Sequence, residues 1–353
     1  MATRRAFLAG LATACLPIVT WAEVGSPAFL AAGKQGQDFT LHGLSPQGQS
    51  LFNISLPGRG HAAAAHPTQA LAVAFARRPG TFALVIDCLT GLVRHQLTPP
   101  LGRQFNGHGA FSTDGSLLMT SEVVAEGSAG RIGVWETATY SRIAEWDSGG
   151  IGPHDLKRLP DGRLIIANGG IQTDPSDRTK LNLPDMRPNL TLLSPEGAVL
   201  DQVELSPDLR QNSIRHLALT ENGAAFAMQW EGDPAEPVPQ LGLWMPGHAP
   251  RLCPPAPGDV FAMKGYAGSI AVRRGGDLIG LTSAPAGAIM LFDIDGTPVV
   301  THHRGDISGV AVGAAGLVAT DGQGAVWRVE TEGITLLAQH EVAWDNHLIA
   351  LES

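Results

Sequence analysis

The chain contains few charged residues and no run of basic ones. Charged residues make up 16% of its 353 residues, and the net charge at pH 7 is −9. An acidic balance without basic clusters disfavours nucleic acid and anionic membrane surfaces as partners. The low charge, together with 43 Gly and 25 Pro, also argues against a coiled coil or a disordered chain, and it suits many short strands joined by turns.

Cysteine and the common catalytic motifs are also scarce. Of the three cysteines, only Cys88 and Cys253 lie beyond the N-terminal apolar segment, and they belong to different sequence repeats, so no disulfide is expected. The chain has no CxxC, HExxH, GxSxG or P-loop sequence. It therefore carries no motif for the redox, protease, hydrolase or nucleotide sites that these patterns mark.

The N-terminal segment has the features of an export signal. In RRAFLAGLATACLPIV (4–19), paired arginines precede Phe-Leu and an apolar stretch, which resembles a twin-arginine signal. The stretch is too short to span a bilayer, so no membrane insertion is expected. We predict a twin-arginine signal peptide over residues 1–22, a single domain over residues 23–353, and export of the folded protein to the periplasm. The alternative is a cytosolic protein with a chance arginine pair.

One pattern recurs along the chain: an apolar strand, a turn of the Asp-Gly kind, a second apolar strand, a polar loop and two further strands. Its copies are GHGAFSTDGSLLMTSE (107–122), GPHDLKRLPDGRLIIANGG (152–170), IRHLALTENGAAFAMQWEG (214–232), GSIAVRRGGDLIGLTSAPAG (268–287) and SGVAVGAAGLVATDGQG (308–324), with a looser copy in GHAAAAHPTQALAVAFARRPG (60–80). Short strands repeated in this way are typical of four-stranded propeller blades.

The two ends of the chain supply a further blade. HLIAL (347–351) has the pattern of a first strand with nothing after it, whereas the segment from Pro27 to Leu56 has the later strands with nothing before them. Joining the two removes an open sheet edge. We therefore predict an all-β, seven-bladed β-propeller, closed by N- and C-terminal strands that share one blade, rather than six or eight blades.

Five of the predicted first strands begin with histidine. These residues are His61, His108, His154, His216 and His347, out of twelve histidines in the chain. First strands line the channel of a propeller and start at the same face, so the five imidazoles should converge at one mouth of the channel. The other two first strands carry Ser269 and Ser308 there, and we expect that side to be open to a water, a chelate or a substrate.

Clustered imidazoles should stay neutral, because protonated neighbours repel each other. Neutral imidazole is a common ligand of zinc, copper and iron, so metal binding is the leading hypothesis. Two alternatives stay open. The histidines could hydrogen bond to the backbone, to carboxylates or to water in a solvated channel, or protonated imidazoles could hold a small anion.

Polar side chains are expected around the same mouth, because the second strands end there. The candidates for the rim or for hydrogen bonding to the histidines are Glu122, Asn168, Gln229, Glu231, Asp321, Asp155 and Asp345. Carboxylates in these places could complete a metal's coordination or orient imidazole N–H groups.

A long polar loop, IQTDPSDRTKLNLPDMRPN (171–189), follows one of the second strands. A loop of this length without a strand pattern is often functional or mobile. We expect it to cover the channel mouth and to present Asp174, Lys180, Asn182 or Met186, with an ordinary solvated loop as the alternative.

Several sequence blocks together resemble the exported propellers of domain-of-unknown-function family 1513. They are GHGAFSTDG (107–115), GIGPHDL (150–156), ANGGIQTDP (167–175), SIRHLA (213–218) and WDNHL (344–348). The resemblance covers nearly the whole predicted domain. It implies a periplasmic protein. It also suggests a role in iron handling, since genes of this family often lie beside those of imelysin-like, iron-regulated periplasmic proteins.

These observations favour a monomeric periplasmic propeller that binds a metal ion or a small metal chelate, with iron first and copper second, and that works with other periplasmic iron-uptake proteins. A metal-dependent periplasmic oxidoreductase that uses the same histidines is one alternative, and it should show a substrate-dependent spectral change. A scaffold that docks partner proteins without a metal is another, and it should keep its partner when the histidines are lost. No catalytic residue is assigned.

Overall fold

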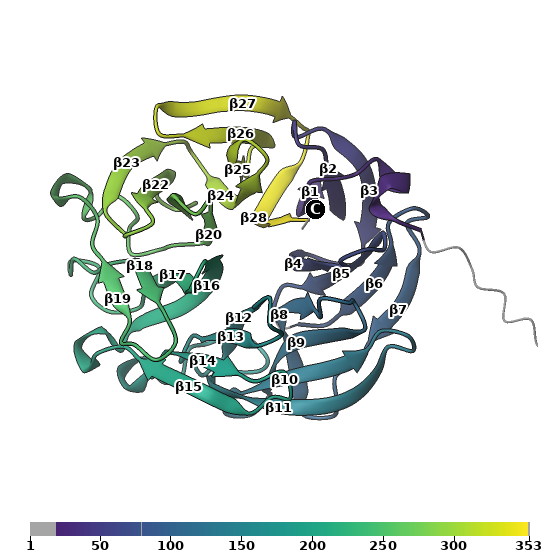
Figure 1. Cartoon of the computed structure of the whole chain (residues 1–353), viewed down its shortest axis with the longest axis horizontal. Helices are drawn as coiled ribbons and strands as arrows, with labels where there is room; N and C mark the ends of the chain where they lie inside the picture. Colours follow the sequence, from purple (N-terminus) through teal and green to yellow (C-terminus); the bar gives the residue numbers. More distant parts are fainter. Residues whose placement is uncertain (1–18, 79, 352–353) are drawn as a thin grey trace, which may run out of the picture.

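The computed structural model describes residues 19–78 and 80–351, which form seven four-stranded antiparallel sheets. The sheets are arranged like blades around a central axis (Figure 1). The predicted all-β, seven-bladed β-propeller is therefore confirmed. Residues 1–18, most of the predicted signal peptide, lie outside the described residues. Just after them, Thr20 pairs with Gln69, and the indole N–H of Trp21 donates to the carbonyl oxygen of His66 at 2.8 Å.

Each blade has an innermost strand beside the channel and an outermost strand at the rim. The blades are β28 (Ala343–Ala350), β1 (Phe29–Gln35), β2 (Asp38–Leu44) and β3 (Ser50–Leu56); β4 (Gly60–Ala65), β5 (Leu71–Ala76), β6 (Ala83–Asp87) and β7 (Val93–Leu97); β8 (Arg103–Phe111), β9 (Leu117–Val124), β10 (Ala129–Glu136) and β11 (Ser141–Ile151); β12 (Pro153–Arg158), β13 (Leu164–Asn168), β14 (Asn189–Leu193) and β15 (Val199–Glu204); β16 (Asn212–Thr220), β17 (Gly223–Trp230), β18 (Leu241–Trp244) and β19 (Arg251–Cys253); β20 (Ser269–Val272), β21 (Leu278–Ser283), β22 (Ala288–Asp293) and β23 (Pro298–His303); β24 (Ile307–Gly313), β25 (Gly316–Asp321), β26 (Ala325–Glu330) and β27 (Gly333–Gln339). Short 3-10 helices lie in the connections: η1 (Trp21–Val24), η2 (Leu183–Asp185), η3 (Pro207–Leu209) and η4 (Pro257–Asp259).

The ring closes through strands from opposite ends of the chain. β28 pairs with β1 in antiparallel register, with Phe29 opposite Ala350 and Ala31 opposite Leu348. In Figure 1 the yellow β28 lies beside the purple β1 and next to the channel. The closure predicted from the sequence is confirmed, and it pairs the inner edge of β1, which would otherwise be free.

Tight turns between strands follow the local chemistry of Asp and Gly. Between β8 and β9, Asp114 Oδ1 accepts hydrogen bonds from Ser112 Oγ at 2.6 Å and from the backbone N–H of Ser116 at 3.0 Å. Gly115 follows with φ of +73°, a value that strains any residue with a Cβ. Turns of this kind fix the lengths of the hairpins that join the first and second strands.

Neighbouring blades are held together by apolar side chains between the sheets. Phe75 and Val85 of one blade pack in a cluster with Phe105, Leu118 and Trp135 of the next, and these five side chains are at most 3% exposed. Burial of one such side chain contributes roughly 1.5–3 kcal/mol. The innermost strands are therefore enclosed by packed blades, and polar side chains that point into the channel are buried.

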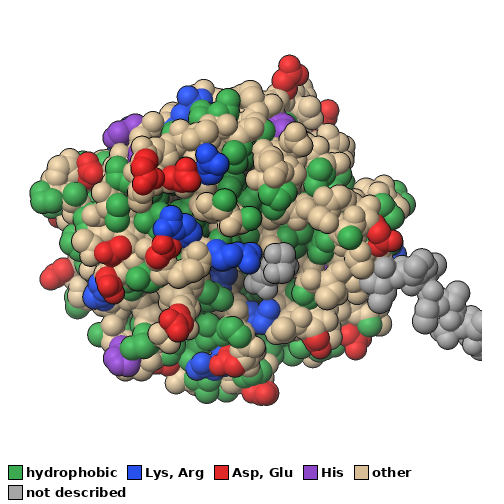
Figure 2. All heavy atoms as spheres, turned by 45° about the horizontal axis from the view of Figure 1, so that its top comes forward, with side chains coloured by type: hydrophobic (Ala, Val, Ile, Leu, Met, Phe, Trp, Pro, Cys, Tyr) green, Lys and Arg blue, Asp and Glu red, His purple; other side chains and the backbone are tan. Residues whose placement is uncertain are grey.

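The face of the molecule drawn in Figure 2 is mixed in charge. In Figure 2, acidic and basic side chains alternate over the visible face, and Lys and Arg side chains border a hollow near its middle.

Candidate metal centre

The five first-strand histidines come together in the channel. In four of them, neighbouring ring centroids are 5.6 Å (His61–His154), 4.7 Å (His154–His216), 4.8 Å (His216–His347) and 4.4 Å (His347–His61) apart, so these imidazoles form a ring. His108 packs against all four, with centroid distances between 4.9 and 5.8 Å. We call these five residues the histidine cluster.

Each histidine lies beside an irregularity in the pairing of its strand. In β12 the register shifts between Pro153 and Asp155, so His154 is the extra residue, and in β16 the shift directly precedes His216. Corresponding shifts occur where β4 carries His61, where β8 carries His108 and where β28 carries His347. A β-bulge bends the strand and redirects a side chain. Because the bulge recurs in all five strands, the imidazoles share one direction into the channel.

The histidines are buried and four of them are neutral near pH 7. Exposed fractions range from 4% for His108 and His154 to 9% for His61. Burial, and then repulsion from neighbouring imidazoles and arginines, holds the pKa values of His61, His154, His216 and His347 well below 6.5. Neutral imidazoles keep a lone pair free for a metal.

Several ring nitrogens of the cluster have no hydrogen-bond partner within the described part of the chain. They are His61 Nδ1, His108 Nε2, His154 Nδ1 and His347 Nε2, all of them buried. A buried polar atom left without a partner costs about 1–3 kcal/mol. The backbone and carboxylate partners that a purely structural role would require are thus lacking at four positions, and a bound ion would satisfy several of them together.

The nitrogens are spaced closely enough for a shared ion. Ligand nitrogens of His61, His108 and His347 lie within 4.8 Å of one another, and so do those of His108, His154 and His216. Metal–imidazole bonds of about 2.0–2.1 Å place ligand nitrogens roughly 3.3–4.2 Å apart. Movements of less than about 1 Å per side chain would therefore complete either set. His108 belongs to both sets, so the two candidate positions share a ligand.

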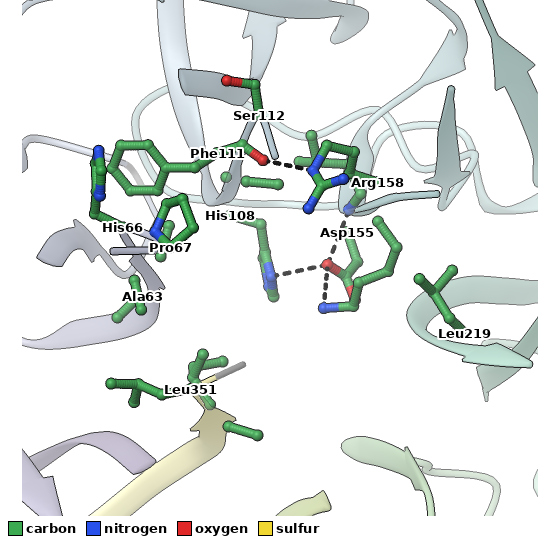
Figure 3. A pocket seen from close by; sticks show the side chains of 18 of the residues that line it. Ala63, His66, Pro67, His108, Phe111, Ser112, Asp155, Arg158, Leu219 and Leu351 are labelled. Carbon is green, nitrogen blue, oxygen red and sulfur yellow. Dashed lines mark hydrogen bonds and ion pairs between the residues drawn. The ribbon is translucent and has the colours of Figure 1, made fainter. Parts of the chain in front are cut away.

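Asp155 orients His108. Its Oδ1 lies 3.3 Å from His108 Nδ1 and 3.4 Å from Lys157 Nζ, and its Oδ2 accepts the backbone N–H of Leu217 at 3.0 Å. Figure 3 shows the Asp155 carboxylate facing the His108 ring. Burial alone would raise the pKa of Asp155, but Lys157 and His108 outweigh it and hold the pKa well below its usual range. With Nδ1 facing a carboxylate, Nε2 of His108 is the nitrogen free for a metal, as in carboxylate–histidine–metal sites.

The cluster lies between two cavities. The first, of about 210 Å³, is lined by the four ring histidines and by Arg77, Arg78, Arg178, Lys180, Arg215, Gln229, Glu231, Tyr266 and Asn346, and we call it the basic cavity. The second, of about 170 Å³, is lined by His108 and Asp155, by further polar residues such as Lys157 and Arg158, and by apolar residues that include Phe111 and Leu219 (Figure 3). The four-histidine ring therefore faces the basic cavity, and His108 faces the other one.

The expectation of an opening beside the two serines is wrong. His216 and His347 flank the serine strands, yet their ring centroids are 4.8 Å apart, so the imidazoles close over that side. Ser269 Oγ instead accepts the backbone N–H of Val310 at 3.2 Å. The accessible side of the cluster is the basic cavity along the channel axis.

Three predicted rim residues lie within their blades. Glu122 accepts a hydrogen bond from Arg142 at 2.6 Å, and Asn168 donates one to Asn189 at 2.9 Å. Asp321 accepts one from the indole N–H of the tryptophan in β26 at 2.9 Å. These side chains turn toward the third and fourth strands of their blades or toward neighbouring strands, so they stabilise blades and do not contact the cluster.

The other predicted rim residues lie at or near the basic cavity. Gln229 lines it and donates to a backbone carbonyl at 3.2 Å, while Glu231 lines it and pairs with Lys180. Asp345 forms ion pairs with Arg59 at 2.5 Å and with Arg77 at 3.7 Å. Asp155 is thus the predicted carboxylate that contacts the cluster in the described structure.

The 171–189 loop borders the basic cavity, but the residues predicted to cover it have different roles. Lys180 lines the cavity. Asn182 bonds two backbone groups of the loop, at 2.7 and 2.9 Å, and so holds its two arms together. Asp174 is half-buried and accepts a hydrogen bond from Ser176 within the loop, and Met186 is completely buried beneath it.

Arginine is the feature that the sequence interpretation missed. Arg77 and Arg78 follow the second strand of their blade, where rim residues were expected, and Arg215 immediately precedes a cluster histidine. Their position directly after a second strand could therefore have predicted that Arg77 and Arg78 lie at the rim of the channel. Arg178 lies on the loop and has no equivalent in the repeat, so no repeat signal marks it.

The fold and the cluster define a seven-bladed β-propeller with a candidate histidine metal site in its channel. The chain belongs to the family described as "Protein of unknown function (DUF1513)", which matches residues 54–351. The predicted resemblance is thereby confirmed. A search of the curated proteins gave no match. In residues 19–78 and 80–351, no helix is both long enough and apolar enough to cross a membrane.

Solved structures share the propeller fold at low sequence identity. A chain of Kuenenia stuttgartiensis hydrazine synthase is 12% identical with a TM-score of 0.61, over 86% of this chain and 90% of that one. A chain in the crystal structure of a mitotic checkpoint complex is 11% identical with a TM-score of 0.55, over 78% and 75%. At such identities the similarity shows the fold alone.

Proposed function

We propose that the histidine cluster binds a transition-metal ion and that the protein handles iron, with copper as the second candidate, in the periplasm. Two observations carry the proposal together: ligand nitrogens of the five histidines converge in two overlapping groups, and four of these histidines have a buried ring nitrogen without a partner in the described part of the chain. A structural role for the histidines would need a partner for each of these nitrogens. A metal ion bound by either group would contact one nitrogen of each of three histidines at once.

The donor set supports a late first-row divalent ion. The cluster offers neutral nitrogen ligands, whereas Mg²⁺ and Ca²⁺ prefer oxygen ligands. Imidazole suits Fe, Cu, Zn and Ni, and affinity among divalent ions rises toward Cu²⁺. Iron is placed first because of what the family resemblance implies, and the choice between iron and copper is made by experiment.

The shape of the site favours exchange of the ion over permanent storage. The ring of four imidazoles faces a cavity of about 210 Å³, so a ligand can reach an ion there without opening the blades. A closed structural site would have no such access. We infer that the protein takes up an ion or a small chelate at this cavity and passes it on to another periplasmic iron-uptake protein.

Metal titration of protein without an affinity tag tests the proposal. We expect the full chain to bind Fe²⁺ or Cu²⁺ with a stoichiometry of at least one, and His108→Ala to lose affinity by about tenfold or more, because His108 belongs to both groups. His303→Ala is the matched control, since His303 is exposed at the end of β23, and it should bind like the wild type. A wild-type protein that binds none of Fe²⁺, Cu²⁺, Zn²⁺ and Ni²⁺ would contradict the proposal.

A further inference from the structure

The basic cavity holds more positive charge than its own carboxylates neutralise. Five basic side chains line it, and two of them are paired, Lys180 with Glu231 and Arg77 with Asp345. For the other three, Arg78, Arg178 and Arg215, the described part of the chain provides no ion pair and no side-chain hydrogen bond. Three guanidinium groups thus share one small cavity, and none of them is paired with a carboxylate of the described residues.

Arg215 is the strongest indication of a missing anion. Its side chain is 8% exposed and its Nε is buried without a partner. A buried charge is normally paired, because water no longer solvates it. The nearest stabilising carboxylate, Glu231, is already bonded to Lys180. Arg215 also sits at the bulge of β16 next to His216, so the strand irregularity that directs the imidazole presents the guanidinium to the same cavity.

Arg78 and Arg178 add to this unbalanced charge from other parts of the chain. Burial, together with repulsion from Arg215, Arg178 and Arg77, lowers the pKa of Arg78 to about 9. Arg178 has φ of +67°, a left-handed conformation that is uncommon outside glycine. Such local strain is found where surrounding structure holds a residue in place for a function. Here hydrogen bonds of the 171–189 loop at Asp174 and Asp177 hold it.

We propose that the basic cavity binds a small oxyanion ligand with two or three negative charges, carried on carboxylate or phosphate groups. Guanidinium groups bind both kinds of oxygen through paired hydrogen bonds. The cavity volume of about 210 Å³ is many times the roughly 10–15 Å³ that a single water requires, so the cavity has room for a small polycarboxylate.

The position of the cavity connects the anion to the metal. Four cluster histidines and the three unpaired arginines line the same cavity. An anion held by the arginines would therefore lie directly beside the accessible side of the four-histidine ring. Resting on the proposed function, this arrangement indicates that the metal arrives as an anionic chelate, whose oxygens bind the arginines while the ion meets the histidines.

Calorimetry on the metal-free full chain tests the anion site, with citrate and inorganic phosphate as separate probes. We expect at least one probe to bind, with an affinity that falls as salt rises, and the stronger of the two identifies the carboxylate or phosphate chemistry. Arg215→Gln should weaken binding about 10- to 100-fold, since a charge-assisted contact is lost. Arg178→Gln, on an exposed loop residue, should weaken it without any risk to folding.

The matched control is Arg163→Gln, because Arg163 pairs with Asp161 in a surface turn away from the cavity, and it should bind like the wild type. Absence of binding for both probes, or unchanged binding by both arginine variants, would overturn the inference.

A second pair of titrations separates this inference from the proposed function. His108→Ala should weaken Fe²⁺ binding about tenfold or more and leave anion binding unchanged, while Arg178→Gln should weaken anion binding and leave Fe²⁺ binding unchanged. If the wild type binds Fe²⁺ but neither anion, the anion site is refuted and the metal site stands. If the wild type binds an anion but no metal, the proposal that the metal arrives as an anionic chelate is refuted and the anion site stands.

Discussion

At the scale of single residues, the site depends on which ring nitrogen of each imidazole is hydrogen bonded and which one is free to bind a metal. His108 has one nitrogen against Asp155 and the other free, and it touches every other member of the cluster. The remaining four are neutral because burial opposes their protonation. A metal site therefore needs both the carboxylate that orients His108 and the low pKa values that keep the other lone pairs available.

Replacing the orienting carboxylate should weaken metal binding without removing any ligand. We expect Asp155→Asn to lower metal affinity about 10- to 100-fold, the usual effect of losing a carboxylate that bonds a ligating histidine. Competition with a chelator of known affinity measures the change. Asp161→Asn, in a surface turn, serves as the control. An Asp155→Asn protein with wild-type affinity would show that His108 needs no orienting partner.

The lowered histidine pKa values predict how the metal-free protein responds to acid. The unfolded chain takes up protons at these positions as the pH falls below about 6.5, whereas the folded protein resists protonation. Stability is thus fully present above pH 6.5 and is lost as the pH falls from there through the lowered folded values. Each such histidine contributes up to about 1.4 kcal/mol per pH unit.

Urea unfolding between pH 5 and pH 8 measures this dependence. His216→Gln should lose less stability between pH 6.5 and pH 5 than the wild type does, because one titrating group is gone, and His303→Gln should follow the wild type. Parallel curves for wild type and His216→Gln would contradict the pKa shift.

At the scale of strands and loops, irregular pairing positions the chemistry. The five histidines lie at or next to bulges, near the start of β4 and β12 but inside β8, β16 and β28, which begin earlier than the sequence predicted, and the bulge in β16 also presents Arg215. The 171–189 loop brings Arg178 and Lys180 to the same cavity. The repeated first strands thus provide the imidazoles, while features that do not repeat, such as the 171–189 loop, provide basic side chains around them.

The loop depends on Asn182 for its shape. Asn182→Ala removes two hydrogen bonds, at 2.7 and 2.9 Å, that join the two arms of the loop, so we expect local opening to become easier by about 1–3 kcal/mol. Hydrogen exchange of residues 172–181 should speed up while exchange in the blades stays unchanged. Asn222→Ala, on an exposed turn, is the control. Unchanged exchange in the loop would mean that other contacts hold it.

At the scale of the whole molecule, one strand pairing closes the ring. β28 joins the two ends of the chain and carries His347. It also contacts β24 and β4, which are the innermost strands of the two neighbouring blades. The same strand is therefore part of the fold's closure and part of the site.

Deletion of residues 346–353 tests that closure. The deletion removes most of β28 and leaves Phe29, Leu30 and Ala31 of β1 without their partners, so the unfolding transition should broaden and its midpoint should fall steeply. Differential scanning calorimetry records both changes. A truncated protein that melts as cooperatively as the full chain, at the same temperature, would show that β28 is dispensable for the ring.

The fold and the cluster could be predicted from the sequence because both follow from the repeat. Each first strand begins at the same place in its blade, so His61 and His347 could be assigned to one channel although the chain separates them widely. The directions of other side chains are not set by the repeat. Glu122 lies near the end of a second strand, which continues to Val124, and it turns toward Arg142 because a charge partner lies within the blade. Arg178 reaches the cavity through a left-handed residue of a unique loop, which no periodic pattern encodes.

X-ray absorption spectroscopy of the metal-loaded protein tests the central claim most directly. The claim is that one ion is held by at least three imidazoles of the histidine cluster. The account predicts a first shell of nitrogen at about 2.0–2.2 Å with the multiple scattering of at least three imidazole rings, and one ring fewer in His108→Ala. A shell of oxygen ligands without imidazole scattering, or a spectrum that His108→Ala leaves unchanged, would contradict it.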